Sequence, residues 1–237
     1  MIPLRLAGEW PKRPPALDAE QQRAREDFIH FWHRAMPERL GFIEHFNQGF
    51  VTGLPARPGA RTLEIGPGLG AQARWRGAVS DGYYCLELRE IFCARMRELL
   101  APDHVFQGDI QSRQPWPDGW FERIIAVHLL EHLVDLPAAL AEVDRLLAPG
   151  GCFDVVIPCE GGLAYGIARK VSAERLFRRR YRMDYTPIRL NEHVSTYRDV
   201  VGELVRRFEI SKRAFYPLRV PAMSINLFVG MRLAKRA

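Results

Sequence analysis

The stretch RTLEIGPGLGA, residues 61–71, decides the fold of this chain. RTLEI has the composition of a short buried strand, and Gly66, Gly68 and Gly70 follow it directly. Glycines at such a place let the backbone turn tightly and approach a ligand without a Cβ clash. Together with Ala71, the stretch also matches the looser dinucleotide pattern G-x-G-x-x-G/A. The motif alone therefore leaves two classes of adenosine cofactor open.

Strands and helices alternate after this stretch. Apolar segments at 82–88, 104–110, 121–127 and 152–158 predict strands, and a helix is predicted from about Leu136 to Leu147, stopped by residues 149–151 (Pro-Gly-Gly). This alternation is typical of parallel βαβ units. Segments 207–216 and 223–233 predict an antiparallel strand pair at the end. We expect an α/β, Rossmann-like, doubly wound and mostly parallel seven-stranded sheet with that antiparallel C-terminal pair.

An N-terminal arm and helical cap, residues 1–58, are expected to precede the main domain of residues 59–237. Residues 1–16 are Pro-rich, and Asp18 is a suitable N-cap for a helix. Aromatic and methionine side chains recur at helical spacing in two segments: Phe28, Phe31, Trp32 and Met36, then Phe42, Phe46 and Phe50. We expect them to pack against the main domain, and the alternative is that some line a substrate pocket.

Composition indicates a globular protein with a sizeable core. Hydrophobic residues make up 47% and charged residues 26% of 237, and the formal net charge is +6. The four cysteines have no CxxC spacing, the chain does not open with a signal peptide, and no apolar run has the length of a membrane span. We expect a reduced, cytoplasmic protein.

Acidic residues near the strand ends narrow the choice of cofactor. Glu87 ends the second strand about twenty residues after the glycines, where a carboxylate can accept both ribose hydroxyls of either cofactor class. Glu64 lies in the first strand, Asp109 ends the third, and EVDRLLAPGG leads into a further strand. In this order, the motifs resemble the class I S-adenosylmethionine-dependent methyltransferases, closely over residues 60–160 and in outline at the C-terminal strand pair.

The resemblance implies S-adenosylmethionine as cofactor and a role for each matching position. The glycine loop with Glu64 would surround the methionine portion and ribose, Glu87 would hold the ribose hydroxyls, and the backbone near His128 would lie by the methionine amino group. The implied cofactor-binding residues are Glu64, Gly66, Gly68, Gly70, Glu87, Leu88, Asp109, Ile110 and His128. Leu88 and Ile110 would pack on the adenine, and Asp109 would accept from its amino group. Taken alone, Asp109 fits a turn or a helix cap better.

HLLEHL, residues 128–133, contains the inverted zinc-peptidase pattern His128-x-x-Glu131-His132. That metal site needs a helix that presents both imidazoles from one face. Here a predicted buried strand precedes His128 directly and Pro137 follows soon after, which leaves room for a short turn only. We therefore expect no metal site.

Two histidines are candidates for acid–base work on an acceptor. His132 could act as a general base on a substrate hydroxyl, or could be structural beneath the cofactor. His193, in RLNEHVSTY, follows the fifth strand, where this fold builds its acceptor pocket, and a surface or capping histidine is the alternative there.

A lid is expected at about residues 160–198, between the fifth and sixth strands. It contains Arg175, Arg178, Arg179, Arg180 and Arg182 with two tyrosines, a set that could grip phosphate or carboxylate or could be a solvated helix face. The absence of a separate RNA-binding module favours a small-molecule, sugar or lipid-linked acceptor over nucleic acid. We expect O-methylation of such an acceptor. The alternatives are a non-catalytic cofactor-binding or scaffold protein, and an NAD-dependent oxidoreductase.

Overall fold

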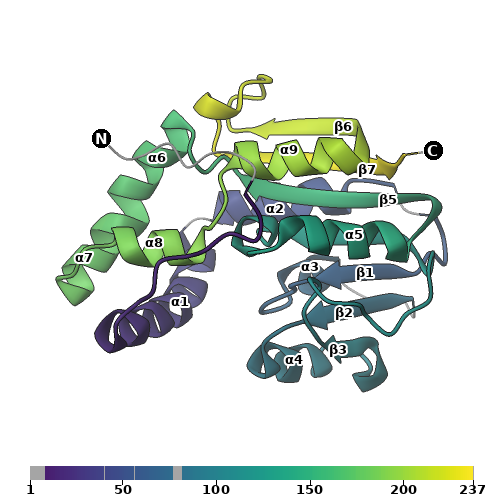
Figure 1. Ribbon diagram of the computed structural model, residues 1–237, viewed down its shortest axis with the longest axis horizontal. Helices are drawn as coiled ribbons and strands as arrows, with labels where there is room; N and C mark the ends of the chain where they lie inside the picture. Colours follow the sequence, from purple (N-terminus) through teal and green to yellow (C-terminus); the bar gives the residue numbers. More distant parts are fainter. Residues whose placement is uncertain (1–8, 40, 56, 77–81, 237) are drawn as a thin grey trace.

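A computed structural model describes residues 9–39, 41–55, 57–76 and 82–236. Its centre is a seven-stranded sheet in the order β3-β2-β1-β4-β5-β7-β6 (Figure 1). The strands are β1 (Thr62–Ile65), β2 (Tyr83–Glu87), β3 (Val105–Gln107), β4 (Phe121–Val127), β5 (Leu147–Pro158), β6 (Phe208–Tyr216) and β7 (Phe228–Lys235). Strands β1 to β5 run parallel, and β7 is antiparallel to β5 and β6. The predicted fold class is confirmed.

The boundary between the predicted helix and the following strand lies one residue earlier than expected, before Leu147. Asp135 caps helix α5 (Leu136–Leu146), because its side chain accepts a hydrogen bond from the Ala138 amide. Leu147 already belongs to β5. Leu147 pairs with Phe121, whereas Cys152 pairs with Arg123. The residues between them bulge out of the ladder through Gly150 at φ +71°, so the Pro-Gly-Gly segment shapes the strand rather than the helix end.

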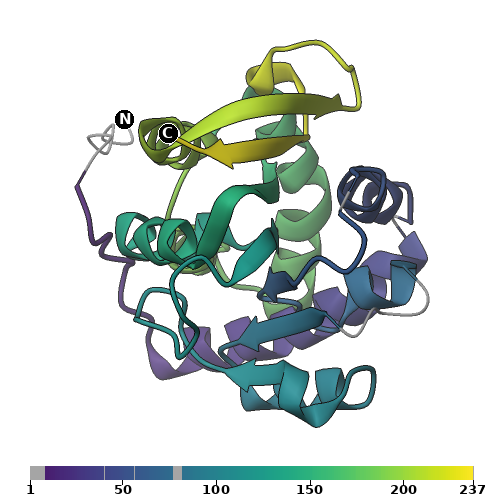
Figure 2. The same ribbon diagram turned by 90° about the vertical axis from the view of Figure 1, so that its right-hand side faces the viewer.

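The remaining helices are α1 (Ala19–Arg39), α2 (Gly41–Thr52), α3 (Ala71–Arg76), α4 (Glu90–Arg97), α6 (Leu163–Arg169), α7 (Arg175–Tyr181), α8 (Thr186–Glu192) and α9 (Tyr197–Arg207). Some of them cover the sheet, while α1, α7 and α8 lie beyond one end of its strands (Figures 1 and 2). A π-helical segment, Lys170–Glu174, joins α6 to α7 without a break. Within the ranges given above, no helix combines the length and apolar composition needed to cross a membrane.

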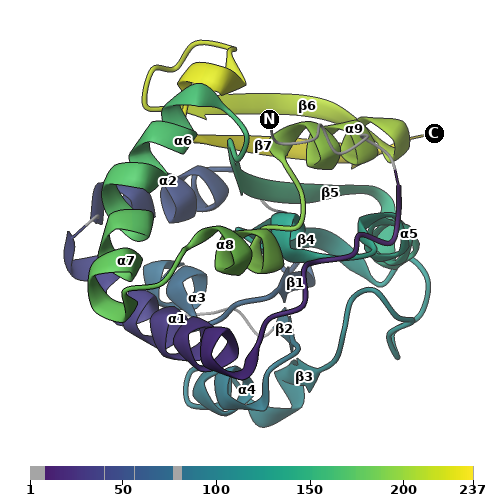
Figure 3. The same ribbon diagram turned by 60° about the vertical axis from the view of Figure 1, so that its left-hand side comes forward.

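Helix α1 packs on α7 and α8, not on the sheet (Figure 3). The side chain of Asp18 accepts from the amides of Glu20 and Gln21, which confirms it as the helix cap. Phe28 is buried and meets Phe177 edge-on, with ring centroids 5.1 Å apart. Phe31 and Trp32 join the same cluster, so these residues contact the part of residues 59–237 that lies between the fifth and sixth strands, and not the sheet. The side chain of Met36 lies outside the described residues.

Helix α2, in contrast, packs against the sheet as expected. Phe46 and Phe50 join the cluster on one face of the sheet, and Phe46 stacks on Tyr216 with ring centroids 5.0 Å apart. The buried guanidinium of Arg123 in β4 donates to the Val51 carbonyl in α2 at 2.6 Å and to Asp154 at 2.7 Å. The side chain of Phe42 lies outside the described residues. The two predicted cap helices therefore pack on different parts of the molecule.

Candidate active site

The glycine-rich turn follows β1 at the carboxyl edge of the parallel strands (Figure 1). Its three glycines all have positive φ: Gly66, Gly68 and Gly70. At Gly68, where φ is +54°, a Cβ atom would meet no protein atom within 4 Å. At Gly66 a Cβ would lie 2.9 Å from Leu129, which places the glycine turn against the loop after β4. The turn therefore has an open side at Gly68 and a packed side at Gly66.

Glu87 ends β2 beside this turn and is fixed by backbone donors. One carboxylate oxygen accepts from the Gly68 amide at 3.2 Å and the other from the Arg89 amide at 2.9 Å. Each carboxylate oxygen has a second lone pair, so both can accept a further hydrogen bond from a ligand hydroxyl. The side chain is buried, and its direction is set before any ligand arrives.

The HLLEHL stretch is a loop with one short turn. His128 follows β4 directly with φ +52°, and a 3₁₀ turn covers Leu130–His132. His128 Nδ1 lies 3.5 Å from Oε1 of the buried Glu131. Burial opposes ionisation of Glu131, but the hydrogen bond from His128 and the neighbouring imidazoles prevail and lower its pKa to about 2. The strand-end position predicted for His128 is correct, and the peptidase helix is excluded.

The structure brings His132 and His193 together, although 60 residues separate them from each other along the chain. Their ring centroids are 4.9 Å apart. His132 Nδ1 lies 2.7 Å from the Glu192 carbonyl oxygen, which can only accept, so this nitrogen carries the proton and Nε2 has the free lone pair. His193 Nδ1 lies 3.2 Å from a carboxylate oxygen of Glu160.

The two imidazoles differ in their affinity for a proton. Burial has the largest influence on the pKa of His132 and lowers it, although Glu131 beside it acts in the opposite direction. Burial would also lower the pKa of His193, but the hydrogen bond with Glu160 and the charge of Glu131 outweigh it, so this pKa is raised. His132 is therefore the weaker base of the pair, and it is the imidazole that more readily stays neutral, with a lone pair to accept a proton, near pH 7.

Glu131, His132 and His193 also offer three potential metal ligands. One ligand atom from each lies within 4.8 Å of the others, so these side chains could hold a cation. Sequence spacing indicated only Glu131 and His132, because His193 follows α8, about 60 residues further along the chain.

Comparison with known proteins assigns the domain. Residues 63–155 match the family model described as "Methyltransferase domain". Over these residues, which are less than half of its length, the chain resembles a methyltransferase domain. A sterol 24-C-methyltransferase of Gibberella zeae is 32% identical over 42% of this chain and 28% of its own length. A malonyl-[acyl-carrier protein] O-methyltransferase of Pectobacterium atrosepticum is 28% identical over 47% of this chain and 44% of its own. The chain thus spans less than half the length of these curated relatives.

Among solved structures, a methyltransferase of Thermotoga maritima described as a possible histamine N-methyltransferase has the same fold. The TM-score is 0.62 at 20% identity, and the match covers 91% of this chain and all of the other. At this identity the likeness extends to the fold alone.

The cofactor of class I methyltransferase domains is S-adenosylmethionine, and the residues at the glycine turn fit it. The space over Gly68 is open to a ligand, and the Glu87 carboxylate is fixed beside it. Leu88 is 60% exposed and Ile91 is 61% exposed, so two large apolar side chains at the end of β2 are free to cover an adenine ring. Sequence reasoning missed Ile91, since it reads as an ordinary residue of the following helix.

Three other predicted cofactor residues already have partners in the methyltransferase domain. Glu64 is buried and accepts from the Tyr83 hydroxyl at 2.8 Å. Asp109 accepts from the backbone amide and the side chain of Gln111, which fits the turn-cap alternative. Ile110 is only 3% exposed and belongs to the core cluster, so the structure does not support its predicted contact with the adenine.

Replacing Glu87 by alanine is expected to weaken S-adenosylhomocysteine binding by about 1–3 kcal/mol, because charge-assisted hydrogen bonds to the ribose are lost. Titration calorimetry measures the affinity, and a thermal melt shows whether the loss of the Gly68 and Arg89 contacts has unfolded the turn. Glu90→Ala, three residues away and paired with Arg97 on the surface, is the matched control. Equal affinity of both variants and the wild type would contradict the assignment.

Two arginines between β5 and β6 pair with Glu160 beside His193, and neither was predicted. Arg169 and Arg189 lie 2.6 Å and 3.4 Å from the same oxygen of Glu160, the buried carboxylate that also meets His193. Burial opposes ionisation of Glu160, but the hydrogen bond with His193 and these charges lower its pKa. No local motif marks Arg169 or Arg189, because each is an isolated arginine on an amphipathic helix.

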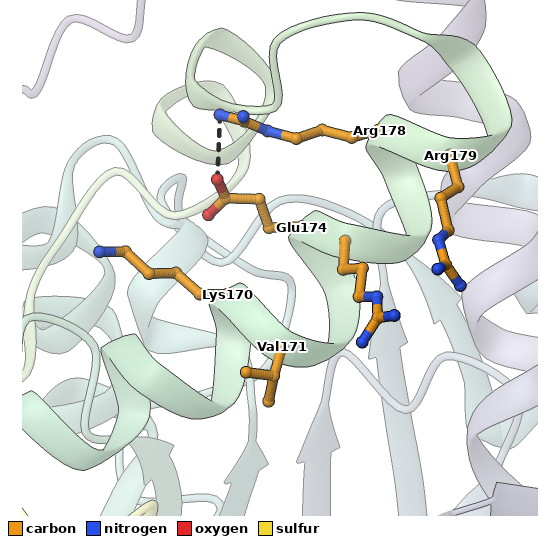
Figure 4. A pocket seen from close by; sticks show the side chains of 6 residues that line it. Lys170, Val171, Glu174, Arg178 and Arg179 are labelled. Carbon is orange, nitrogen blue, oxygen red and sulfur yellow. Dashed lines mark ion pairs between the residues drawn. The ribbon is translucent and has the colours of Figure 1, made fainter.

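The predicted arginine run lies on the exposed side of the lid instead. Arg175, Arg178, Arg179, Arg180 and Arg182 are all exposed. Arg178 pairs with Glu174, as Figure 4 shows, and Arg180 pairs with Asp27 of α1. The run does not surround the histidine pair.

Proposed function

We propose that this protein transfers a methyl group from S-adenosylmethionine to an oxygen of a small-molecule, sugar or lipid-linked acceptor. The observation that supports it is the Nε2 lone pair of His132, in the loop after β4 whose Leu129 lies against the glycine turn at Gly66. A cofactor at the turn and an acceptor hydroxyl at this imidazole would be neighbours. The domain match supports the cofactor, and His132 supports the choice of a hydroxyl acceptor.

In the proposed reaction, the bound cofactor supplies an electrophilic methyl group on a sulfonium. The acceptor oxygen would receive this methyl group as the sulfonium becomes a thioether, and His132 Nε2 would take the hydroxyl proton. The Glu192 carbonyl holds His132 in the required tautomer. Glu131 beside it stabilises the imidazolium that forms. His193, held by Glu160, is suited to donate a hydrogen bond to the acceptor.

An acceptor site bounded on one side by the lid is supported by the ion pairs of Glu160 with Arg169 and Arg189. They join α6 and α8 to the loop after β5 through one buried carboxylate. We propose that this contact positions His193, because Glu160 accepts from its Nδ1 atom. A cytoplasmic location is proposed on the basis of the described cysteines, which are all free thiols.

The experiment that tests the cofactor class is a calorimetric comparison of two ligands. We expect S-adenosylhomocysteine to bind the wild type and NAD not to bind. The reverse result would replace the methyltransferase proposal by the oxidoreductase alternative. Transfer of a labelled methyl group to a panel of hydroxyl acceptors then tests catalysis. Cofactor binding with no transfer to any acceptor would favour the non-catalytic alternative.

A further inference from the structure

The continuous helical stretch from α6 to α7 has two faces of different chemistry. Its inner face carries Tyr165, Arg169, Ala173 and Phe177, which recur every four residues. Arg169 pairs with Glu160, Ala173 and Phe177 are buried against α1 and α8, and Tyr165 packs in the core beside β7. The four side chains of this inner face therefore all contact other parts of the protein.

The outer face carries a second series with the same spacing, offset by two residues. Leu163, Ile167 and Val171 are 67%, 55% and 65% exposed, and Arg175 and Arg179 continue the series. An offset of two residues is about 200° around a helix, which places the second series opposite the first. The π-helical turn at 170–174 has more residues per turn, so it offsets the drift of a four-residue repeat and keeps the series on one side.

The cations of this outer face are available for a partner. Lys170, Arg175 and Arg179 have no ion pair in the part of the chain that the structure describes, while the carboxylate of Glu174 is already paired with Arg178. In Figure 4, Val171 and Arg179 point to the side of the helix away from the Glu174–Arg178 pair. We call Leu163, Ile167, Lys170, Val171, Arg175 and Arg179 the outer lid face.

The connection between β6 and β7 lies at the start of this helix and also exposes aliphatic side chains. A Cβ atom at Gly162, just before α6, would lie 3.1 Å from the Met223 carbonyl oxygen, so the connection packs against the start of the helix (Figures 1 and 3). The connection exposes Leu218, Val220 and Ile225. Exposed aliphatic side chains concentrated in this way are typical of an interaction site.

We propose that the outer lid face docks the protein on an anionic lipid membrane. Aliphatic side chains that enter the headgroup region beside unpaired arginine and lysine are the chemistry of an interfacial amphipathic helix. The cations match phosphate groups of the lipid. A free phosphate ion would leave the aliphatic series without a partner, so a lipid surface fits the whole face better. A second copy of this chain fits less well, because a twofold contact through this face would bring its own cations together.

This docking connects the membrane to the proposed acceptor site. One helix would meet lipid with its outer face, while Arg169 on its inner face meets Glu160 beside His193. A lipid-linked acceptor would then enter the lid from the surface on which the protein is docked. The choice of acceptor class rests on the proposed function, whereas the docking itself is measured without cofactor or acceptor.

Vesicle co-sedimentation of the full chain tests the proposal. We expect binding to phosphatidylcholine vesicles that contain about one third phosphatidylglycerol, little binding to phosphatidylcholine alone, and weaker binding as salt is raised. The double variant I167D/V171D is expected to bind about tenfold or more weakly, because two charges replace side chains that enter the lipid. R175Q/R179Q should lose binding to anionic vesicles and its salt dependence.

The controls separate docking from folding and from self-association. V205D alters an exposed valine on α9, outside the outer lid face, and should bind vesicles like the wild type. All variants should retain wild-type affinity for S-adenosylhomocysteine, which shows that the fold is intact. The proposal is overturned if the wild type ignores anionic vesicles, if I167D/V171D binds as well as V205D, or if size-exclusion chromatography shows a dimer that I167D/V171D abolishes.

Discussion

Gly68→Val is expected to reduce S-adenosylhomocysteine affinity by at least about a hundredfold while the protein remains folded. The backbone at Gly68 has φ +54°, and an added Cβ atom would meet no protein atom within 4 Å. The added Cβ atom therefore meets open space in the free protein, and the branched side chain would occupy the space over the turn where a cofactor must approach. It would also strain a backbone conformation that valine rarely adopts, at a cost of about 1–3 kcal/mol.

Gly59→Val separates the strain from the loss of ligand space. Gly59 has φ +71°, also has no atom within 4 Å of an added Cβ, and lies in an exposed turn before β1. The two variants should lose similar stability in a denaturant titration, and only Gly68→Val should lose cofactor affinity in calorimetry. If Gly68→Val binds as tightly as Gly59→Val, the glycine turn is not the cofactor site.

The parts of the fold that local patterns specify were predictable. Each strand of the parallel sheet is a short apolar run bounded by Gly, Pro or charged residues, so β4 could be placed at 121–127 without error. The same logic placed the glycine turn, and it placed Glu87 at the end of β2. These features depend on residues close together in the chain.

The contacts that link distant segments were not predictable. Phe28 has the spacing of a core-facing helix residue whether it meets the sheet or the lid, and only the structure shows Phe177 as its partner. His193 was a candidate by position alone, and nothing in the sequence indicates that its ring lies 4.9 Å from that of His132. Ile110 had the right place in the motif, but packing turned its side chain into the core.

His132→Ala is expected to lower turnover by about a hundredfold or more and to leave S-adenosylhomocysteine affinity within a few-fold of the wild type. The imidazole has its lone pair on Nε2 and a lowered pKa, so it is available as a base at neutral pH. It has no role in the glycine turn that would change cofactor binding. Single-turnover methyl transfer and calorimetry on the same preparations measure the two quantities. His30→Ala removes an exposed imidazole of α1 and should change neither.

The outcome also decides between a base and a metal ligand, since Glu131, His132 and His193 could hold a cation. A base acts without metal, so treatment of the wild type with a chelator should leave turnover unchanged. One equivalent of metal that is lost in both His132→Ala and His193→Ala would make the imidazoles ligands. A fall in turnover with no metal in any preparation leaves proton transfer to His132 as the explanation, because a cation site would lose its metal together with its activity.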